Sequence, residues 1–239
     1  MKFWLIIRKL KILLGYLNPN LRFISKGNVY KRMKFSGIAL DYVIKNKNFR
    51  TVLDVGSGGG KHSDIFEKEG KIVTRFDFGK SRAFTDDSQK IIYGDFLDYD
   101  FKTSYELIWV SHVLEHTLYT HQFLQKILNV GSKNAIVAIT VPPAKPEFVG
   151  GHLTLWTPAL LLYRMVLAGF DCSNAKVLVY GYNISVVCEI QKNSLSISDL
   201  AWDLHDIKKI EKWLPKDLNL LADGSRYGTI YKGADNYFF

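Results

Sequence analysis

Short apolar runs alternate with amphipathic segments along most of the chain. Runs typical of buried strands occupy residues 51–56, 71–77, 90–95, 105–111, 134–143, 175–182 and 183–191. Apolar residues recur at helical spacing over residues 36–46, 62–70, 121–131 and 157–170. Strands that alternate with helices predict an α/β fold with a mainly parallel sheet.

The last two apolar runs meet at a turn of only two or three residues, so they can pair only as an antiparallel hairpin. We therefore expect a Rossmann-like sheet of seven strands, mostly parallel, with this C-terminal hairpin and with helices on both faces. Thr157 is expected to cap the helix that begins at Pro158. The expected parts of the chain are a basic N-terminal helical extension (1–47), a core (48–192) and a C-terminal helical tail (193–239). Within the tail, residues 196–214 predict one helix capped by Ser198.

The composition is that of an ordinary globular protein, with 47% hydrophobic and 23% charged residues, which argues against wholesale disorder. Cys172 and Cys188 show no metal-type spacing and no disulfide framework, so a reducing, cytoplasmic compartment is expected. The charge is unevenly placed. Residues 1–50 hold 12 Lys/Arg and a single acid, Asp41, a net of +11, while the other 189 residues hold 20 Lys/Arg and 22 acids, a net of −2. This asymmetry predicts an anionic partner for the N-terminal segment.

Residues 1–17 have the pattern of an amphipathic basic helix, with Arg8 and Lys11 away from the apolar face. The segment is too short and too charged to span a bilayer, and no signal-peptide cleavage site follows it. Two interpretations stay open. The helix packs on protein, either its own domain or the partner in a homodimer, or it lies on an anionic membrane surface at the inner face with Trp4 at the interface. The apolar face consists of Phe3, Ile6, Ile7, Leu10, Leu13, Leu14 and Leu17.

A glycine-rich loop follows the first predicted strand, in the sequence LDVGSGGGKHS. It reads D-x-G-x-G-x-G, formed by Asp54, Gly56, Gly58 and Gly60. Glycine is needed where a backbone turns sharply and approaches a ligand, and ligands bind at the carboxyl ends of parallel strands. The spacing fits neither a phosphate loop nor a dinucleotide fingerprint.

Acids follow at the ends of the next two strands, as Asp77 and Asp95. Together with the glycine-rich loop they resemble the class I S-adenosylmethionine-dependent methyltransferases, in their small-molecule (Methyltransf_11/23-like) group, over residues 48–192. The resemblance implies that Asp54 and the glycines line the methionine end of the cofactor. It also implies that Asp77 holds the ribose hydroxyls, and that Asp95 binds the adenine amine with Phe96 stacked on the ring. The expected cofactor-binding residues are Asp54, Gly56, Ser57, Gly58, Gly60, Asp77, Phe78, Asp95, Phe96 and Ser111.

The stretch SHVLEHTLYTH, residues 111–121, faces the methyl group in this family. Base N-methyltransferases carry Asn/Asp-Pro-Pro-Tyr/Phe here, and its absence disfavours methylation of an exocyclic base amine. His112, Glu115 and His116 resemble the Glu-x-x-Glu-His metal ligands of ubiquinone-pathway O-methyltransferases and small-RNA 2′-O-methyltransferases, with His112 in place of the first Glu. His152, in HLTLWT, matches the His-x-x-x-Trp-Thr pattern of the RNA enzymes.

A hydroxyl acceptor needs either a base or a metal that lowers its pKa. Three interpretations stay open: a divalent metal, with Mn, Fe, Co or Zn suited better than Mg to three imidazoles; a histidine base without metal; or a structural role. The expected catalytic and metal-ligating residues are His112, Glu115, His116 and His152. Outside the site, His121 is expected to cap a helix or face solvent, His62 to cap its helix, and His205 to be exposed.

We expect O-methylation of a small-molecule or glycan acceptor. A sugar in a surface polysaccharide or a glycolipid precursor is favoured, because the carriers of such sugars are anionic lipids and the N-terminus is basic. A ribose 2′-hydroxyl of RNA is less favoured, since no RNA-binding module accompanies the core. A quinone or small phenol is third. A non-catalytic, cofactor-binding partner subunit is a further alternative, against which the intact glycine and acid motifs argue.

Overall fold

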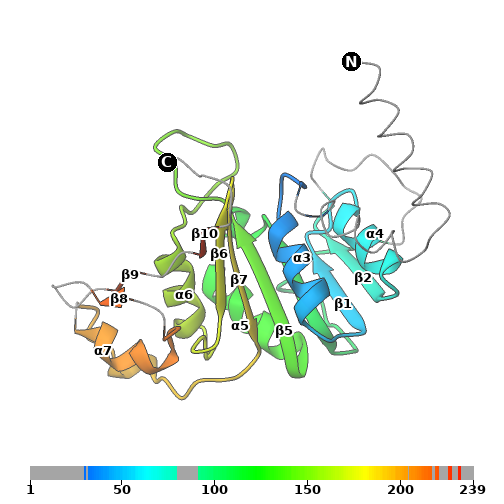
Figure 1. Cartoon of the computed structure of the whole chain (residues 1–239). Helices are drawn as coiled ribbons and strands as arrows, with labels where there is room; N and C mark the ends of the chain where they lie inside the picture. The colour runs from blue at the N-terminus through cyan, green and yellow to red at the C-terminus, as the bar shows by residue number, and fades with distance from the viewer. Residues whose placement is uncertain are drawn as a thin grey trace.

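The computed structural model describes Tyr30, residues 32–79, 91–203 and 205–216, and the short strand segments 219–220, 226–227 and 231–232. A central sheet with helices on both sides dominates the structure (Figure 1). The amphipathic helix expected at residues 1–17 lies outside the described residues.

The main sheet has the strand order β10-β6-β7-β5-β4-β1-β2-β3. β7 is antiparallel to both of its neighbours, and the other neighbouring pairs are parallel. The expected seven-stranded sheet with a terminal hairpin is therefore confirmed, and β10 adds a further edge strand. The strands are β1 (Thr51–Val55), β2 (Ile72–Asp77), β3 (Ile91–Tyr93), β4 (Tyr105–Ser111), β5 (Gly131–Val141), β6 (Lys176–Tyr180), β7 (Asn183–Glu189) and β10 (Tyr231–Lys232). A separate antiparallel pair is formed by β8 (Asn219–Leu220) and β9 (Arg226–Tyr227).

Helices cover both faces of the sheet, as expected. α3 (Gly37–Asn46) and α4 (Lys61–Lys68) pack on one face, and α5 (Thr120–Val130) and α6 (Pro158–Leu167) pack on the other. The alternation of β4 supplies both cores, because Leu107 belongs to the α3 side and Ile108 to the α5 side. Within the described ranges, no helix is long and apolar enough to cross a membrane.

Two helices can be compared directly with the expectations from the sequence. Thr157 caps α6 as predicted, since its Oγ1 accepts a hydrogen bond of 3.1 Å from the Leu160 N–H. α3 lies in the segment expected to be an extension, yet its Ala39, Leu40 and Val43 are fully buried against the sheet. The polypeptide just before residue 48 thus contributes to the core of the molecule.

The prediction of a single helix over residues 196–214 is wrong. The chain forms η2 (Ile197–Asp199), α7 (Asp206–Ile210) and η3 (Glu211–Trp213) instead, and Ser198 does not cap a helix. The buried carboxylate of Asp206 accepts the N–H groups of Ala201 and Trp202 at 3.0 and 2.7 Å, so it folds the preceding residues back toward α7. This local side-chain competition with the helix is characteristic of Asp.

Candidate functional site

The glycine-rich loop connects β1 to α4 at the carboxyl edge of the sheet. Gly56, Gly58 and Gly60 have φ values of 73, 52 and 71°, in the left-handed region that favours glycine. A Cβ on Gly56 would lie 2.2 Å from Cγ2 of Val113, so the loop packs directly against the segment that follows β4. A Cβ on Gly58 would meet no heavy atom within 4 Å, so the backbone there borders space in which a ligand can approach.

Asp77 ends β2 and holds the glycine-rich loop. Its Oδ2 accepts the Gly58 N–H at 2.8 Å, and its Oδ1 accepts the Gly79 N–H at 2.9 Å. Each carboxylate oxygen has more than one acceptor position, so both can also accept from a ribose hydroxyl. The geometry is compatible with the ribose-binding role, which stays a prediction.

Asp54 lies near the end of β1, two residues before Gly56, and is buried. Its Oδ2 accepts a hydrogen bond of 2.6 Å from the Ser63 hydroxyl. Burial raises the pKa of this carboxyl to about 6, because the charged form is desolvated, and the Ser63 hydrogen bond opposes the shift. A buried acid with few partners is suited to a cationic group, which the ammonium of S-adenosylmethionine would supply.

Of the residues expected at the adenine end of the cofactor, two are exposed and one is buried. Asp95 is exposed, and its Oδ1 accepts the Leu97 N–H at 2.8 Å in a local turn. Phe78 is also exposed. Phe96, the residue expected to stack on adenine, is only 5% exposed and packs among other aromatic rings of the core, and the stacking role stays a prediction. Those rings are Phe76, Phe101 and Phe123.

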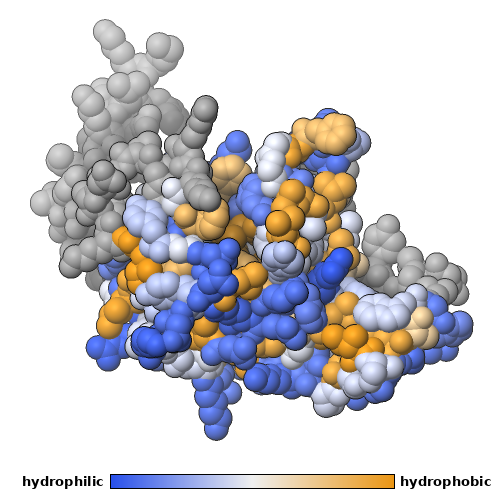
Figure 2. Space-filling model, turned by 180° about the vertical axis from the view of Figure 1, so that it is seen from behind, coloured by the Kyte–Doolittle hydropathy of each residue, from blue (hydrophilic) through white to orange (hydrophobic). Residues whose placement is uncertain are grey.

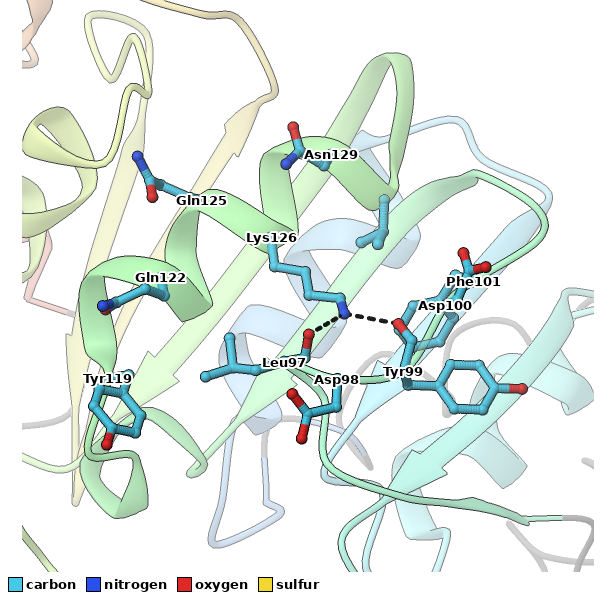
Figure 3. Close-up of a pocket in the computed structure, with 11 residues that line it drawn as sticks. Leu97, Asp98, Tyr99, Asp100, Phe101, Tyr119, Gln122, Gln125, Lys126 and Asn129 are labelled. Atoms are coloured by element: carbon cyan, nitrogen blue, oxygen red, sulfur yellow. Dashed lines mark hydrogen bonds between the residues drawn. The ribbon is translucent and has the colours of Figure 1, made fainter.

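An open hollow of about 810 Å³ lies beside the loop that follows Asp95 (Figure 3). It is bounded by residues 97–101 and by the outer surface of α5, and none of the site residues predicted from the sequence lines it. Lys126 crosses it and donates to the carbonyl oxygens of Leu97 and Tyr99 at 2.5 and 2.7 Å. This lysine therefore anchors the loop at the expected adenine end.

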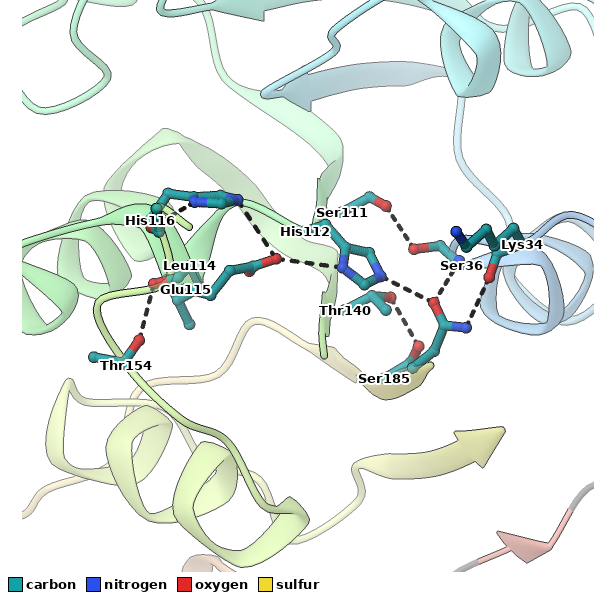
Figure 4. A network of polar contacts seen from close by, with 12 residues as sticks. Lys34, Ser36, Ser111, His112, Leu114, Glu115, His116, Thr140, Thr154 and Ser185 are labelled. Atoms are coloured by element: carbon teal, nitrogen blue, oxygen red, sulfur yellow. Dashed lines mark hydrogen bonds and ion pairs between the residues drawn. The ribbon is translucent and has the colours of Figure 1, made fainter. Parts of the chain in front are cut away.

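The other part of the site begins where β4 ends, at His112. This residue has a φ of 56°, in the left-handed region that is uncommon for residues other than glycine, and its N–H donates to the Thr140 carbonyl at 2.8 Å. Its Nδ1 lies 3.3 Å from Oε1 of Glu115, and its Nε2 lies 3.0 Å from Oδ1 of Asn183 (Figure 4). The strained backbone thus directs the imidazole between a carboxylate and an amide.

Glu115 is the most unusual side chain of the site. It is 1% exposed, and within the described residues neither carboxylate oxygen accepts a hydrogen bond. The nearby imidazole nitrogens, Nδ1 of His112 and Nε2 of His116, lie 3.3 and 3.8 Å from Oε1. Burial of a carboxylate without hydrogen bonds is costly, so this position favours a proton donor or a cation beside it.

The hydrogen bond of His116 assigns its ring nitrogens. Nδ1 lies 2.7 Å from the Gly151 carbonyl oxygen. A carbonyl oxygen can only accept, so Nδ1 carries the proton, and Nε2 holds the lone pair in the neutral ring. Nε2 is the nitrogen on the Glu115 side. His116 is therefore oriented to accept a proton or to ligate a metal with Nε2.

His152 joins this group from the loop between β5 and α6. Its ring contacts the His116 ring edge-on, with centroids 5.1 Å apart. Burial lowers its pKa below the usual value, and this keeps the imidazole neutral near pH 7. Ligand atoms of Glu115, His116 and His152 all lie within 4.8 Å of one another. Three of the four residues expected to bind a metal are thus close together, and metal binding stays a prediction.

The remaining histidines lie outside this cluster. His62 does not cap α4: it is half-buried, its ring contacts Trp109 edge-on at 5.3 Å, and its Nε2 donates to the Phe35 carbonyl at 3.2 Å. Burial lowers the pKa of His62 to about 4. His205 is exposed, as expected, and His121 lies partly exposed in α5.

Sequence reasoning missed a second group of residues around His112. Ser36 donates its N–H to Oδ1 of Asn183 at 2.9 Å, and its hydroxyl lies 2.6 Å from the Ser111 hydroxyl. The Phe35 ring contacts His112 edge-on, with centroids 4.7 Å apart. In the sequence, Asn183 begins the last apolar run and Ser36 begins the helical pattern of residues 36–46. Ser36 and Asn183 are 147 positions apart, so no local pattern could have paired them.

Comparison with known proteins identifies a family that matches the part of the chain containing this site. Residues 53–139 match the family described as a methyltransferase domain, Methyltransf_11. A search of curated proteins finds no match. The matched segment contains the glycine-rich loop, the strand-end acids and the His112–His116 stretch.

Several solved structures have a similar fold. A 1,6-didemethyltoxoflavin N1-methyltransferase from Burkholderia thailandensis, solved with S-adenosylhomocysteine, has a TM-score of 0.56 and 15% identity over 80% of this chain and 90% of its own. A sugar N-methyltransferase from Streptoalloteichus has a TM-score of 0.52 and 11% identity over 74% and 93%. A methyltransferase from Archaeoglobus fulgidus has a TM-score of 0.50 and 16% identity over 80% and 94%.

The domain match agrees with the glycine-rich loop observed between β1 and α4 and with the fold shared with these structures. The cofactor of this family is S-adenosylmethionine. The chain is a class I S-adenosylmethionine-dependent methyltransferase and carries a Methyltransf_11 domain.

Proposed function

We propose that this enzyme methylates a hydroxyl of a small polar acceptor, and that the acceptor is a sugar in a surface glycan or a glycolipid precursor. One observation carries the proposal, namely the buried carboxylate of Glu115, which accepts no hydrogen bond within the described residues and faces imidazole nitrogens of His112 and His116. A cluster rich in acceptor atoms suits a substrate that brings its own donor, and a hydroxyl group does so.

The proposed reaction is an in-line displacement. The acceptor oxygen bonds to the methyl carbon while the carbon–sulfur bond of the sulfonium breaks, and S-adenosylhomocysteine leaves with the bonding electron pair. The hydroxyl proton passes to Nε2 of His116, because Nδ1 of that ring is held by the Gly151 carbonyl. Glu115, with Oε1 at 3.8 Å from Nε2, then stabilises the imidazolium.

The same side chains also fit a divalent metal, which is a second candidate arrangement. Ligand atoms of Glu115, His116 and His152 lie within 4.8 Å of one another. The bond from His116 Nδ1 to Gly151 is the outer-shell contact that metal-ligating histidines usually have. Two imidazoles and a carboxylate would suit Mn²⁺, Fe²⁺, Co²⁺ or Zn²⁺ better than Mg²⁺. When bound, such an ion would acidify the acceptor hydroxyl.

The surroundings of the cluster support a sugar acceptor. Phe35 contacts His112 edge-on, and Tyr182 lies nearly parallel to it at 18° with centroids 6.2 Å apart. Aromatic rings next to polar acceptors match a sugar, whose C–H faces are apolar and whose hydroxyls are donors.

The loop that supplies His152 supports a lipid-linked form of this acceptor. It projects above the carboxyl edge of the sheet, and apolar side chains gather on it (Figures 1 and 2). Phe148, Leu153 and Leu155 of this loop are exposed. An apolar surface beside a polar site suits an amphiphilic substrate.

The fold by itself admits other acceptor atoms. Two of the three similar structures named above are an N1-methyltransferase of 1,6-didemethyltoxoflavin and a sugar N-methyltransferase. Our assignment of an oxygen acceptor therefore rests on the cluster around Glu115 and not on these relatives.

The test is transfer of labelled methyl from S-adenosylmethionine to separate acceptor pools: nucleotide-linked sugars, lipid-linked saccharides, RNA, and quinone precursors or phenols. We expect label in the saccharide pools. Label in RNA or in phenols would overturn the acceptor assignment. Tight cofactor binding without transfer to any pool, together with a stable heteromer, would favour a non-catalytic partner subunit.

His116→Ala tests the proton transfer. Because the variant removes the proton acceptor, we expect turnover to fall by roughly 10²–10⁴-fold, while the affinity for S-adenosylmethionine is unchanged. His205→Ala, at an exposed position, is the matched control. Unchanged turnover of His116→Ala would exclude this residue. Stoichiometric metal in elemental analysis, lost in His152→Ala, would favour the metal arrangement.

A further inference from the structure

A buried amide at the start of β7 links the N-terminal segment to the site. Asn183 is 1% exposed and makes hydrogen bonds with both the oxygen and the nitrogen of its side-chain amide. Nδ2 donates to the carbonyl oxygens of Lys34 and Tyr180 at 3.0 and 3.2 Å, and Oδ1 accepts the Ser36 N–H at 2.9 Å. Two carbonyl acceptors on one side and a backbone donor on the other fix the orientation of the amide.

This fixed amide determines which nitrogen of His112 carries a proton. Oδ1 of Asn183 can only accept, so Nε2 of His112, 3.0 Å away, must donate to it. In the neutral ring Nδ1 then holds the lone pair, and it faces Oε1 of Glu115 at 3.3 Å. Nδ1 of His112 and Oε1 of Glu115 are then two acceptor atoms that face each other, and a proton or a cation between them would stabilise both. The orientation of His112 is therefore a second reason to expect a hydrogen-bond donor or a cation beside Glu115.

The same amide ties down residues 34–36. Lys34 and Ser36 both bond to Asn183, and Phe35 between them places its ring against His112 and its carbonyl oxygen on His62. The Ser36 hydroxyl also contacts the Ser111 hydroxyl at 2.6 Å. The three residues therefore form a wall of the site, with contacts to α4, β4 and β7.

We propose that Asn183 is a positioning residue for methyl transfer: it holds His112 in the Nε2–H form, with Nδ1 toward Glu115, and fastens residues 34–36 as a wall of the acceptor site. The backbone of His112 supports this role, because its left-handed φ of 56° is strained and persists only where contacts impose it. The proposal rests on the proposed function for its catalytic meaning, while its structural content can be measured without turnover.

Two readouts without turnover test the proposal in Asn183→Leu. Nitrogen-15 NMR of the labelled histidine ring should show the Nε2–H form of His112 in the wild type and lose it in the variant. Trypsin should cleave after Lys34 roughly tenfold faster in the variant, as expected when buried hydrogen bonds that hold this segment are removed. Cleavage is followed by mass spectrometry of the fragment that begins at Phe35.

Ser185→Ala is the matched control. Ser185 lies on the same strand, is fully buried, and bonds to the hydroxyls of Thr140 and Tyr180, but it contacts neither His112 nor residues 34–36 in any of these bonds. It reports the general cost of losing a buried polar group from β7. Asn183→Asp separates the two roles, because its oxygen still accepts from His112 but cannot donate to Lys34. In Asn183→Asp we expect His112 to keep the Nε2–H form, while trypsin cleaves after Lys34 faster than in the wild type.

Methyl transfer provides the third readout. In Asn183→Leu we expect kcat to fall by about 10–100-fold, the usual cost of losing a partner that orients a functional histidine, with the affinity for S-adenosylmethionine unchanged. An unchanged His112 ring form and an unchanged cleavage rate in Asn183→Leu would overturn the proposal. Absence of wild-type turnover on every acceptor pool would count against the proposed function, and the NMR and proteolysis results would still decide the role of Asn183.

Discussion

Three acidic side chains at the carboxyl edge of the sheet differ in their hydrogen-bond partners and burial. Asp77 is held by two backbone N–H groups, Asp54 is buried with the hydroxyl of Ser63, and Glu115 is buried without a hydrogen bond among the described residues. Their order along the chain does not reveal this difference. The partners in the folded structure decide it.

Asp77→Ala should abolish cofactor binding. Two ribose hydroxyls would lose charge-assisted hydrogen bonds of about 1.5–3 kcal/mol each, so the affinity should fall by at least roughly 100-fold. Calorimetric titration with S-adenosylhomocysteine measures it. Asp100→Ala, which removes an exposed acid outside the predicted site, is the control. Equal affinity in the two variants would remove Asp77 from the cofactor site.

Asp54→Asn should change the pH dependence of stability. The folded pKa of about 6 lies above the ordinary 3.8, so the native state binds the extra proton between these values. The stability of the wild type relative to Asp54→Asn is therefore greatest below pH 4 and falls as the pH rises through 6, by up to about 3 kcal/mol. Denaturant unfolding of both proteins from pH 4 to 7 measures the difference. A constant difference over this range would contradict it.

At the scale of elements, most strands and helices follow from local patterns, and the exceptions have local causes. β1, β2, β4 and β7 coincide with the predicted apolar runs within a few residues. The tail helix fails because Asp206 binds the N–H groups of Ala201 and Trp202, which competes with helical hydrogen bonding. The competing partner lies close in sequence, but only the folded geometry shows that its side chain turns back.

The glycine-rich loop offers a matched pair of substitutions. Gly56→Ala combines a left-handed φ with a Cβ placed 2.2 Å from Val113, so it should destabilise the fold by more than the roughly 1–2 kcal/mol of backbone strain. Gly58→Ala has the strain but no clash, so it should cost only about 1–2 kcal/mol and chiefly weaken cofactor binding. Denaturant unfolding and cofactor titration separate the two effects. A larger loss of stability in Gly58→Ala would contradict this account of the loop.

At the scale of the whole molecule, charge is concentrated in the first 50 residues, with a net of +11 against −2 for the rest. We predict that the full chain floats with anionic liposomes and that removal of residues 1–17 abolishes this binding, because basic side chains and an apolar face both favour an anionic surface. The binding should weaken as salt screens the charge. Zwitterionic liposomes are the control. Equal flotation of both chains would contradict it, and a change in oligomeric state would instead favour packing on a partner.

The sequence by itself determined the α/β class, a mostly parallel seven-stranded sheet with a C-terminal hairpin, and the glycine-rich loop, because alternation, helical spacing, short connections and glycine conformation are local properties. It also located His112, Glu115, His116 and His152. Only the tertiary structure decided that Phe96 belongs to the core and that the imidazole of His112 lies between Glu115 and Asn183. It alone joined Ser36 to Asn183, since hydrogen bonds between distant segments depend on how the sheet brings them together and leave no periodic pattern in the chain.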